Sequence, residues 1–483
     1  MTEHELGYLY QELGTQTSFR IAEILPGNDD DPIQCRVHPA SWSDASIPNA
    51  ICIDQSHISE RNAQVKQMRK IYENARTVLI WLGPDTPEND AETAINTVHL
   101  ISEVLCQKLG ISANGLSARG DVYHEVELVA GYIIMEPAFS KAYGFTDTKW
   151  WWAATATTER LRQPKNWLYM LYLASNFSST DPRDMIYGLH GLMSITRCSE
   201  LLYPDYDKST VEVYMDSVAA AFVDMQNTDV LLYAPGTDHP SWVPRWDRAM
   251  LFRNPFRFGK ALPWSPSLDL KPTRSINAES KVLALRGVLI DSIKVSETYN
   301  ESLFSNANMK LEERRVNLGH VWRRILENLR LSRPSKVYNS SELRIATSLS
   351  FGLNEDINPG EERILMQSFL SCLEIVLDEQ AYQQYISPEL SKEAEQADGY
   401  QFGKPVWDFN YPDSSIFITE KGMIGCCVST TNPGDIITVP FGSTYPFILQ
   451  PHGERFLMGG YGFIHGIMRG EGPQSPEQVF EIC

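Results

Sequence analysis

Alternating apolar and polar positions organise the first eighty residues. Residues 18–38 alternate on both sides of a Pro-Gly-Asn-Asp turn and predict a β-hairpin. Apolar runs at 50–54 and 77–82 predict two further strands, and the intervening residues have the spacing of an amphipathic helix that ends near Arg76. Strand, helix, strand is the order of an α/β sheet, in which ligands bind outside the carboxyl ends of the strands. The apolar stripe of the predicted helix contains Val65, Met68, Tyr72 and Ala75.

After these residues the predicted secondary structure is first mainly helical and then mainly β. Residues 108–175 are mixed and largely helical in pattern, and helices are also predicted at 310–331 and 361–381. The acidic stretch Glu389–Asp398 predicts a loop or linker. Short apolar segments separated by Gly and Pro turns fill 405–470 and predict a small antiparallel sandwich or barrel. The expected fold is therefore α+β overall, with an α/β N-terminal part, a mostly helical middle and a small antiparallel β domain.

Composition and charge indicate which partners and which cellular compartment to expect. The chain of 483 residues has 42 basic and 61 acidic side chains, a net charge of −19. An acidic surface repels phosphate backbones, so we expect no nucleic acid as partner. No apolar run approaches the ~18 residues of a membrane span, and the acidic N-terminus lacks the basic and apolar regions of a secretory signal. Eight cysteines without a C-x-x-C pair predict reduced thiols in a cytoplasmic protein.

Polar side chains gather where the 50–54 strand meets the helix. Glu60 is expected in the first helical turn, where the helix dipole favours a carboxylate by about 0.3–1 kcal/mol. Such a carboxylate suits the stabilisation of a ribosyl cation while a glycosidic bond breaks. Asp54, Gln55, Arg61 and Gln64 are the candidate substrate-binding residues beside it. The alternative is structural: Glu60 serves as a capping contact, and Asp54 and Gln55 bond the backbone of the turn. No motif for a metal or a bound cofactor occurs.

The stretch 51–83 resembles the HET (heterokaryon incompatibility) domain of filamentous fungi, whose pattern is W-I-D-x-x-C-I-N-Q, E-R-x-x-Q-V-x-x-M, I-Y and V-x-x-W-L-G. The matching residues are Cys52-Ile53-Asp54-Gln55, Glu60-Arg61, Gln64-Val65, Met68, Ile71-Tyr72 and Trp81-Leu82-Gly83. Later segments resemble elements that follow HET domains. These are Asp181-Pro182-Arg183-Asp184, Pro204-Asp205-Tyr206, Ser241-Trp242-Val243-Pro244, Gly434-Asp435 and His465-Gly466-Ile467-Met468. In the first of them we expect Asp181 to be a helix N-cap, Pro182 the first helical residue and Arg183 the partner of a carboxylate.

The resemblance implies a HET domain at 18–175, a mainly helical HET-associated region at 176–400 and the β domain at 405–470. It further implies a cytoplasmic fungal protein of non-self recognition, whose activated HET domain triggers growth arrest or cell death. HET domains are similar in expected topology to TIR domains, some of which cleave NAD with a glutamate at a corresponding helix start. The enzymatic alternative therefore makes NAD the substrate and Glu60 the catalytic residue. The other alternative is a signalling module without turnover, which binds other HET domains or an upstream recognition protein.

One departure from the family bears on that choice. Family members place a further strand and helix before the C-I-N-Q strand, whereas only Pro39–Ala50 intervenes here. Twelve residues do not hold a strand of ~5–6 residues and a helix of ~11–12. Either the sequence lacks an exon, or this HET domain is a degenerate copy. Both make the TIR-like sheet incomplete and favour a protein-binding role or inactivity.

Overall fold

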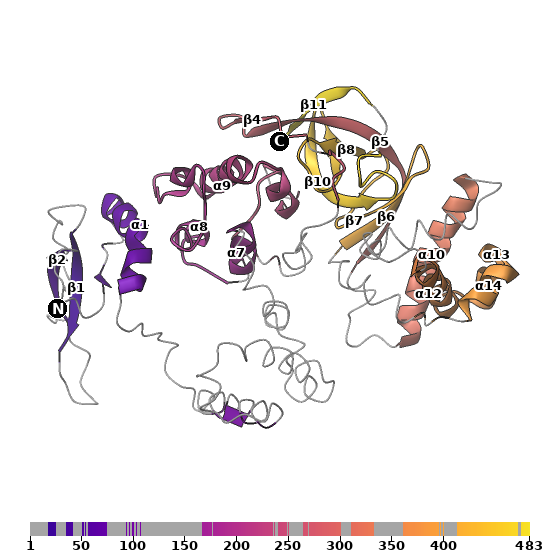
Figure 1. Ribbon diagram of the computed structural model, residues 1–483, viewed down its shortest axis with the longest axis horizontal. Coiled ribbons are helices and arrows are strands. Elements are labelled where there is room, and N and C mark those ends of the chain that lie inside the picture. Colours follow the sequence, from indigo (N-terminus) through magenta and orange to yellow (C-terminus); the bar gives the residue numbers. More distant parts are fainter. Residues whose placement is uncertain are drawn as a thin grey trace, which may run out of the picture. The chain divides into compact units, whose positions relative to one another are not determined.

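The computed structural model of the chain divides into two units, Met1–Val213 and Tyr214–Cys483, and each is described by itself (Figure 1). The structure describes residues 18–25, 35–41, 51–52, 54, 57–74, 93, 96, 99–100, 103, 107, 167–175, 177–234, 236, 240–248, 250, 264–268, 270–300, 311–332, 361–395, 397, 399, 413–471 and 475–483. Among these residues, both helices and antiparallel sheets occur, so the fold class is α+β, as predicted.

An antiparallel three-stranded sheet lies at the start of unit 1. β1 (Ser18–Ile24) and β2 (Cys35–Ser41) pair along their whole lengths and confirm the hairpin predicted at 18–38. β3 (Ile51–Cys52) pairs antiparallel with β1, so that β1 lies in the middle. The strand predicted at 77–82 lies outside the described residues, and the TIR-like parallel sheet stays a prediction.

Helices joined by turns make up most of the remaining described part of unit 1. The predicted helix is present as α1 (Ile58–Asn74). α7 (Trp167–Ala174), α8 (Asp184–Tyr187) and the 3₁₀ turn η2 (Ser199–Leu202) follow along the chain. They bury a small apolar core that includes Trp167, Leu168, Leu171, Ile186 and Leu202. Most of the mixed region predicted at 108–175 lies outside the described residues.

α9 (Thr210–Met225) crosses the boundary between the units, and its start follows from local sequence. Ser209 and Glu212 form a reciprocal capping box: the Ser209 N–H donates to the Glu212 carboxylate (2.7 Å), and the Glu212 N–H donates to Ser209 Oγ (3.3 Å). Along the helix, Val213, Tyr214, Val218 and Phe222 are all buried. The capping residues thus start the helix, and burial of its apolar side chains holds it in place.

The β domain of unit 2 is a closed antiparallel ring. Its strands are β5 (Val282–Asn300), β6 (Asp413–Thr419), β7 (Ile424–Cys427), β8 (Ile436–Pro440), β9 (Phe447–His452) and β10 (Arg455–Ile464). Pairing runs β5, β6, β7, β10, β9, β8 and back to β5. Closure leaves no unpaired strand edge within the ring. This is the barrel alternative of the sequence prediction for 405–470.

Two strands outside that range also pair with β5. They are β4 (Arg274–Asn277) and β11 (Glu477–Ile482). Because β5 is long and has two register shifts, it can pair with different strands along its length. The barrel interior is apolar and contains Ile290, Ile293, Phe417, Cys427, Ile437, Val439, Ile448 and Ile464. The β domain therefore draws strands from both sides of the helical segment that interrupts it.

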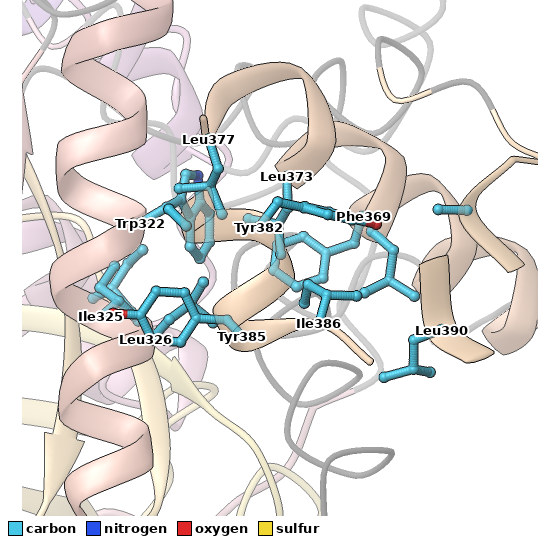
Figure 2. Close-up of a cluster of buried hydrophobic side chains, with 14 of the residues drawn as sticks. Trp322, Ile325, Leu326, Phe369, Leu373, Leu377, Tyr382, Tyr385, Ile386 and Leu390 are labelled. Carbon is cyan, nitrogen blue, oxygen red and sulfur yellow. The ribbon is translucent and has the colours of Figure 1, made fainter. Parts of the chain in front are cut away.

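That helical segment contains α10 (Leu311–Ser332), α12 (Glu361–Val376), α13 (Glu379–Tyr385) and α14 (Pro388–Ala394). Figure 2 shows Trp322 of α10 and Phe369 of α12 in the cluster that they share, and their rings meet edge to face at 5.2 Å. The predicted linker at Glu389–Asp398 is wrong in its first half. Leu390 and Ala394 turn into the cluster, because Pro388 begins a helix there.

Candidate functional site

The first turn of α1 has the placement that the sequence predicts. Glu60 is in that turn, and its Oε1 accepts a hydrogen bond from the Asp54 N–H at 3.0 Å. The Asp54 carbonyl accepts from the His57 N–H at 3.3 Å, which completes the turn into the helix. Glu60 is 8% exposed and Gln64, one turn later, is 2% exposed. Gln55 lies outside the described residues. Glu60 therefore holds the turn before α1 through this hydrogen bond and is largely buried.

Arg61 points to a segment that is distant in sequence. Its Nη2 donates to Asp181 Oδ2 at 2.6 Å, and its guanidinium lies 3.2 Å from the centroid of the Tyr206 ring. The ion pair is partly buried, with side chains 17% and 19% exposed. A charge-assisted hydrogen bond and a cation–π contact thus act on the same guanidinium.

Asp181 is shared between two arginines. Arg183 donates to its carboxylate from Nε (2.9 Å), Nη2 (2.8 Å) and the backbone N–H (3.1 Å). The hydrogen bonds from Arg183 are the main reason that the pKa of Asp181 is lowered to about 2, and the Arg61 bond adds to them. Arg183 Nη1 also donates to the carbonyls of Tyr206 and Lys208, each at 2.7 Å. The carboxylate is therefore ionised and saturated with donors.

The predicted role of this Asp-Pro-Arg-Asp segment is confirmed in part. Arg183 pairs with a carboxylate, as expected, and the Asp181 side chain accepts the backbone N–H two residues later. The α-helix, however, begins at Asp184, with Arg183 as its N-cap, and Pro182 precedes it. Asp181 forms a turn before the helix because its carbonyl accepts the Asp184 N–H at 2.9 Å.

Tyr206 completes the cluster. Its hydroxyl donates to Asp184 Oδ1, and its backbone N–H donates to Asn62 Oδ1 at 3.0 Å. Burial, followed by the hydrogen bond to Asp184, raises the pKa of the Tyr206 phenol, and burial also raises the pKa of Asp184. One turn along α1, the Lys66 ammonium lies 3.8 Å from the ring centroid of Tyr203. We call the set Arg61, Asn62, Asp181, Arg183, Asp184 and Tyr206 the Arg61 cluster.

The chemistry available to the Arg61 cluster is that of a clamp. The contacts of Asp181 and Arg183 are directed to each other, to Arg61, to the Tyr206 ring and to protein backbone. In the described part of the chain, no group of His, Cys, Asp and Glu side chains could hold a metal ion. Glu60 adjoins the cluster but points to the Asp54 N–H, so a reaction at Glu60 would first require that hydrogen bond to open. The arrangement fixes α1 against the 181–206 segment.

The sequence does not connect the segments around Glu60, Asp181 and Tyr206, whereas in the structure α1 contacts the other two across 120 residues or more. The available signal was complementary charge at motif positions: an arginine in E-R, and two acids with one arginine in D-P-R-D. D-P-R-D contains one more acid than base, so it is able to accept a second cation from elsewhere. Charge alone does not identify Arg61 as that cation.

Comparison with known proteins assigns the first part of the chain. Residues 42–141 match the family model described as "Heterokaryon incompatibility protein (HET)". This segment of the chain is similar to the HET domain. Arg61 lies within the matched residues, whereas Asp181 and Tyr206 lie beyond them.

A curated relative agrees with this HET assignment. The chain is 25% identical over 345 residues to "Heterokaryon incompatibility protein 6, OR allele" of Neurospora crassa, an alignment that covers 60% of this chain and 49% of the relative. The chain thus spans about half the length of the curated relative it matches. No solved structure matches it. In the described part of the chain, no helix is both long and apolar enough to cross a bilayer.

Proposed function

We propose that this HET-domain protein acts in heterokaryon incompatibility, as a cytoplasmic component of fungal non-self recognition whose activation stops growth or kills the cell. The observation that carries the proposal is the HET match at 42–141, supported by the likeness to a heterokaryon incompatibility protein of Neurospora crassa. The Arg61 cluster supports it further, because it joins the matched segment to the D-P-R-D and P-D-Y elements that resemble those following HET domains.

The mechanism that the geometry favours is signalling through protein contacts. Glu60 is nearly buried and caps the turn through the Asp54 N–H, and Arg61 is committed to Asp181 and Tyr206. These contacts use the residues that a substrate would need. The partners of such a module are other HET domains or an upstream recognition protein.

Cleavage of NAD by Glu60 is the second candidate. The observation that favours it is the position of this carboxylate, in the first turn of the helix that follows β3. An ionised group there is suited to a developing ribosyl cation. In this mechanism Asp54, Gln55, Arg61 and Gln64 would contact the substrate, and activation would have to withdraw Glu60 from the Asp54 N–H.

Induced expression in a filamentous fungus tests both candidates in one experiment. Wild-type protein is expected to arrest growth above a threshold of expression, and total NAD is measured in the same cells before growth stops. Under the signalling mechanism, Glu60→Gln arrests growth at the same threshold and NAD does not fall in either strain. Under the enzymatic mechanism, wild type depletes NAD and Glu60→Gln does not. Absence of arrest by wild type at every expression level would overturn the proposed function itself.

A further inference from the structure

One face of α1 makes a three-point contact with the segment that contains Asp181 and Tyr206. Arg61 bonds Asp181 and stacks on Tyr206, and Asn62 accepts the Tyr206 N–H. Lys66 lies over Tyr203, one helical turn further along. The α1 side chains in these contacts are charged or carry an amide, and the rings that they meet are tyrosines. This contact lies within unit 1.

The chemistry of the contact is that of an interface that can open. Permanent interfaces resemble an apolar core, whereas contacts between parts that move are smaller and more polar. Both partners of the Arg61–Asp181 pair have alternatives when they separate. Asp181 keeps its bonds from Arg183, and Arg61, already 17% exposed, gains water. Opening therefore leaves no carboxylate buried without a cation, which is the main cost of breaking an ion pair.

We propose that this contact is a latch: the 181–206 segment covers the Arg61–Asn62–Lys66 face of α1 in the resting protein, and an activating partner displaces it from that face. The inference rests on the proposed function, because it assigns the latch to the control of the HET domain. The activating partner would offer α1 the same chemistry as the segment that it displaces. That chemistry is an acidic side chain for the guanidinium of Arg61, and tyrosine rings for this guanidinium and for the ammonium of Lys66.

Hydrogen exchange of the purified full chain, followed by mass spectrometry, tests the latch directly. We compare wild type with Arg61→Gln, which removes the cation but keeps a polar side chain. Peptides from 58–68 and 203–208 are expected to exchange about tenfold faster in the variant, because one charge-assisted contact is lost. Arg245→Gln is the matched control, since Arg245 bonds Asp247 in unit 2 at 2.7 and 2.9 Å. It is expected to leave both peptides unchanged.

The outcomes separate the latch from a purely structural contact. Unchanged exchange at 58–68 and 203–208 in Arg61→Gln would overturn the latch. Faster exchange that extends equally to 167–174 would also overturn it, because the contact would then belong to the fold of the whole unit. Should Arg61→Gln fail to fold, Asn62→Ala provides the same test, because it removes only the acceptor of the Tyr206 N–H.

Growth assays then connect the latch to regulation. At equal protein level, Arg61→Gln is expected to arrest growth at an expression threshold several-fold lower than that of wild type, and Arg245→Gln at the wild-type threshold. Equal thresholds for Arg61→Gln and wild type would show that release of the contact does not activate the protein, and would overturn the latch while the proposed function stands. A wild type that never arrests growth identifies failure of the proposed function, and the exchange data still decide whether the contact opens on its own.

Discussion

Asp229 is a buried acid, and the sign of the stability change on its replacement by asparagine can be predicted. It lies in the 3₁₀ turn η3 (Asp229–Tyr233) of unit 2, where its Oδ1 accepts from Thr444 Oγ1 at 2.5 Å and from the Thr444 N–H at 3.3 Å. Burial raises the pKa of Asp229 from 3.8 to about 6, although the Thr444 hydrogen bonds act in the opposite direction. The neutral acid is thus the form that the fold prefers.

The magnitude follows from that pKa. Each pKa unit corresponds to about 1.4 kcal/mol, so an ionised Asp229 lowers the free energy of unfolding by up to about 3 kcal/mol above pH 6. Because the folded pKa is the higher one, this stability is present below pH 3.8 and is lost as the pH rises from 3.8 to about 6. Asp229→Asn keeps an acceptor for Thr444 and carries no charge. It is expected to stabilise unit 2 by up to about 3 kcal/mol at pH 8, and by about two thirds of that at pH 5.5.

The assay is urea unfolding read by pulsed hydrogen exchange of barrel peptides, which reports unit 2 separately. Asp247→Asn is the control with the opposite sign. Burial raises the pKa of Asp247, but the hydrogen bonds and charge of Arg245 outweigh it, so the pKa is lowered overall and the charge is favourable. The control is therefore expected to destabilise unit 2 at pH 8. An Asp229→Asn protein that is no more stable than wild type at pH 8 would refute this reasoning.

Two further predictions concern packing in unit 2. Gly319→Ala is expected to destabilise the helical cluster by ~1–3 kcal/mol, because an added Cβ would overlap the Val376 carbonyl. This loss exceeds the gain from the better helix propensity of alanine, and thermal unfolding followed by circular dichroism measures it. Ser241→Ala is expected to speed hydrogen exchange in β11 several-fold, because the Ser241 hydroxyl donates to the Cys483 carbonyl and accepts the Met458 N–H at 2.9 Å; unchanged exchange there would show that the strand does not depend on this bridge.

Local patterns predicted the elements well where each is decided by its own residues. The hairpin of β1 and β2, helix α1 and the antiparallel barrel all follow from alternation, helical spacing and turn residues. Glu60 also lies in the first turn, as the sequence predicts. These features depend on short-range geometry, which a single sequence contains.

Long-range arrangement was less predictable, for two physical reasons. Strand periodicity gives no partner, so nothing in 405–470 indicated that β5 and β11 complete the sheet. Charge gives no partner either: the sequence did not indicate that Arg61 bonds Asp181, and its substrate-binding role stays a prediction. The prediction of a loop at Glu389–Asp398 was wrong because it rested on polar composition and ignored the Ser-Pro pair that starts α14. Ser387 Oγ accepts the Leu390 N–H there at 3.4 Å.

The central claim is that α1, within the HET-matched residues, is held against the 181–206 segment. A double-mutant cycle on Arg61 and Tyr206 tests this claim most directly. The opening free energy of α1, from hydrogen exchange of its amides, is measured for wild type, Arg61→Leu, Tyr206→Leu and the double variant. The stacked pair predicts a coupling energy of ~1 kcal/mol. Arg61→Leu combined with Tyr382→Leu, a change in unit 2, is expected to be additive. Full additivity of Arg61→Leu and Tyr206→Leu would contradict the clamp.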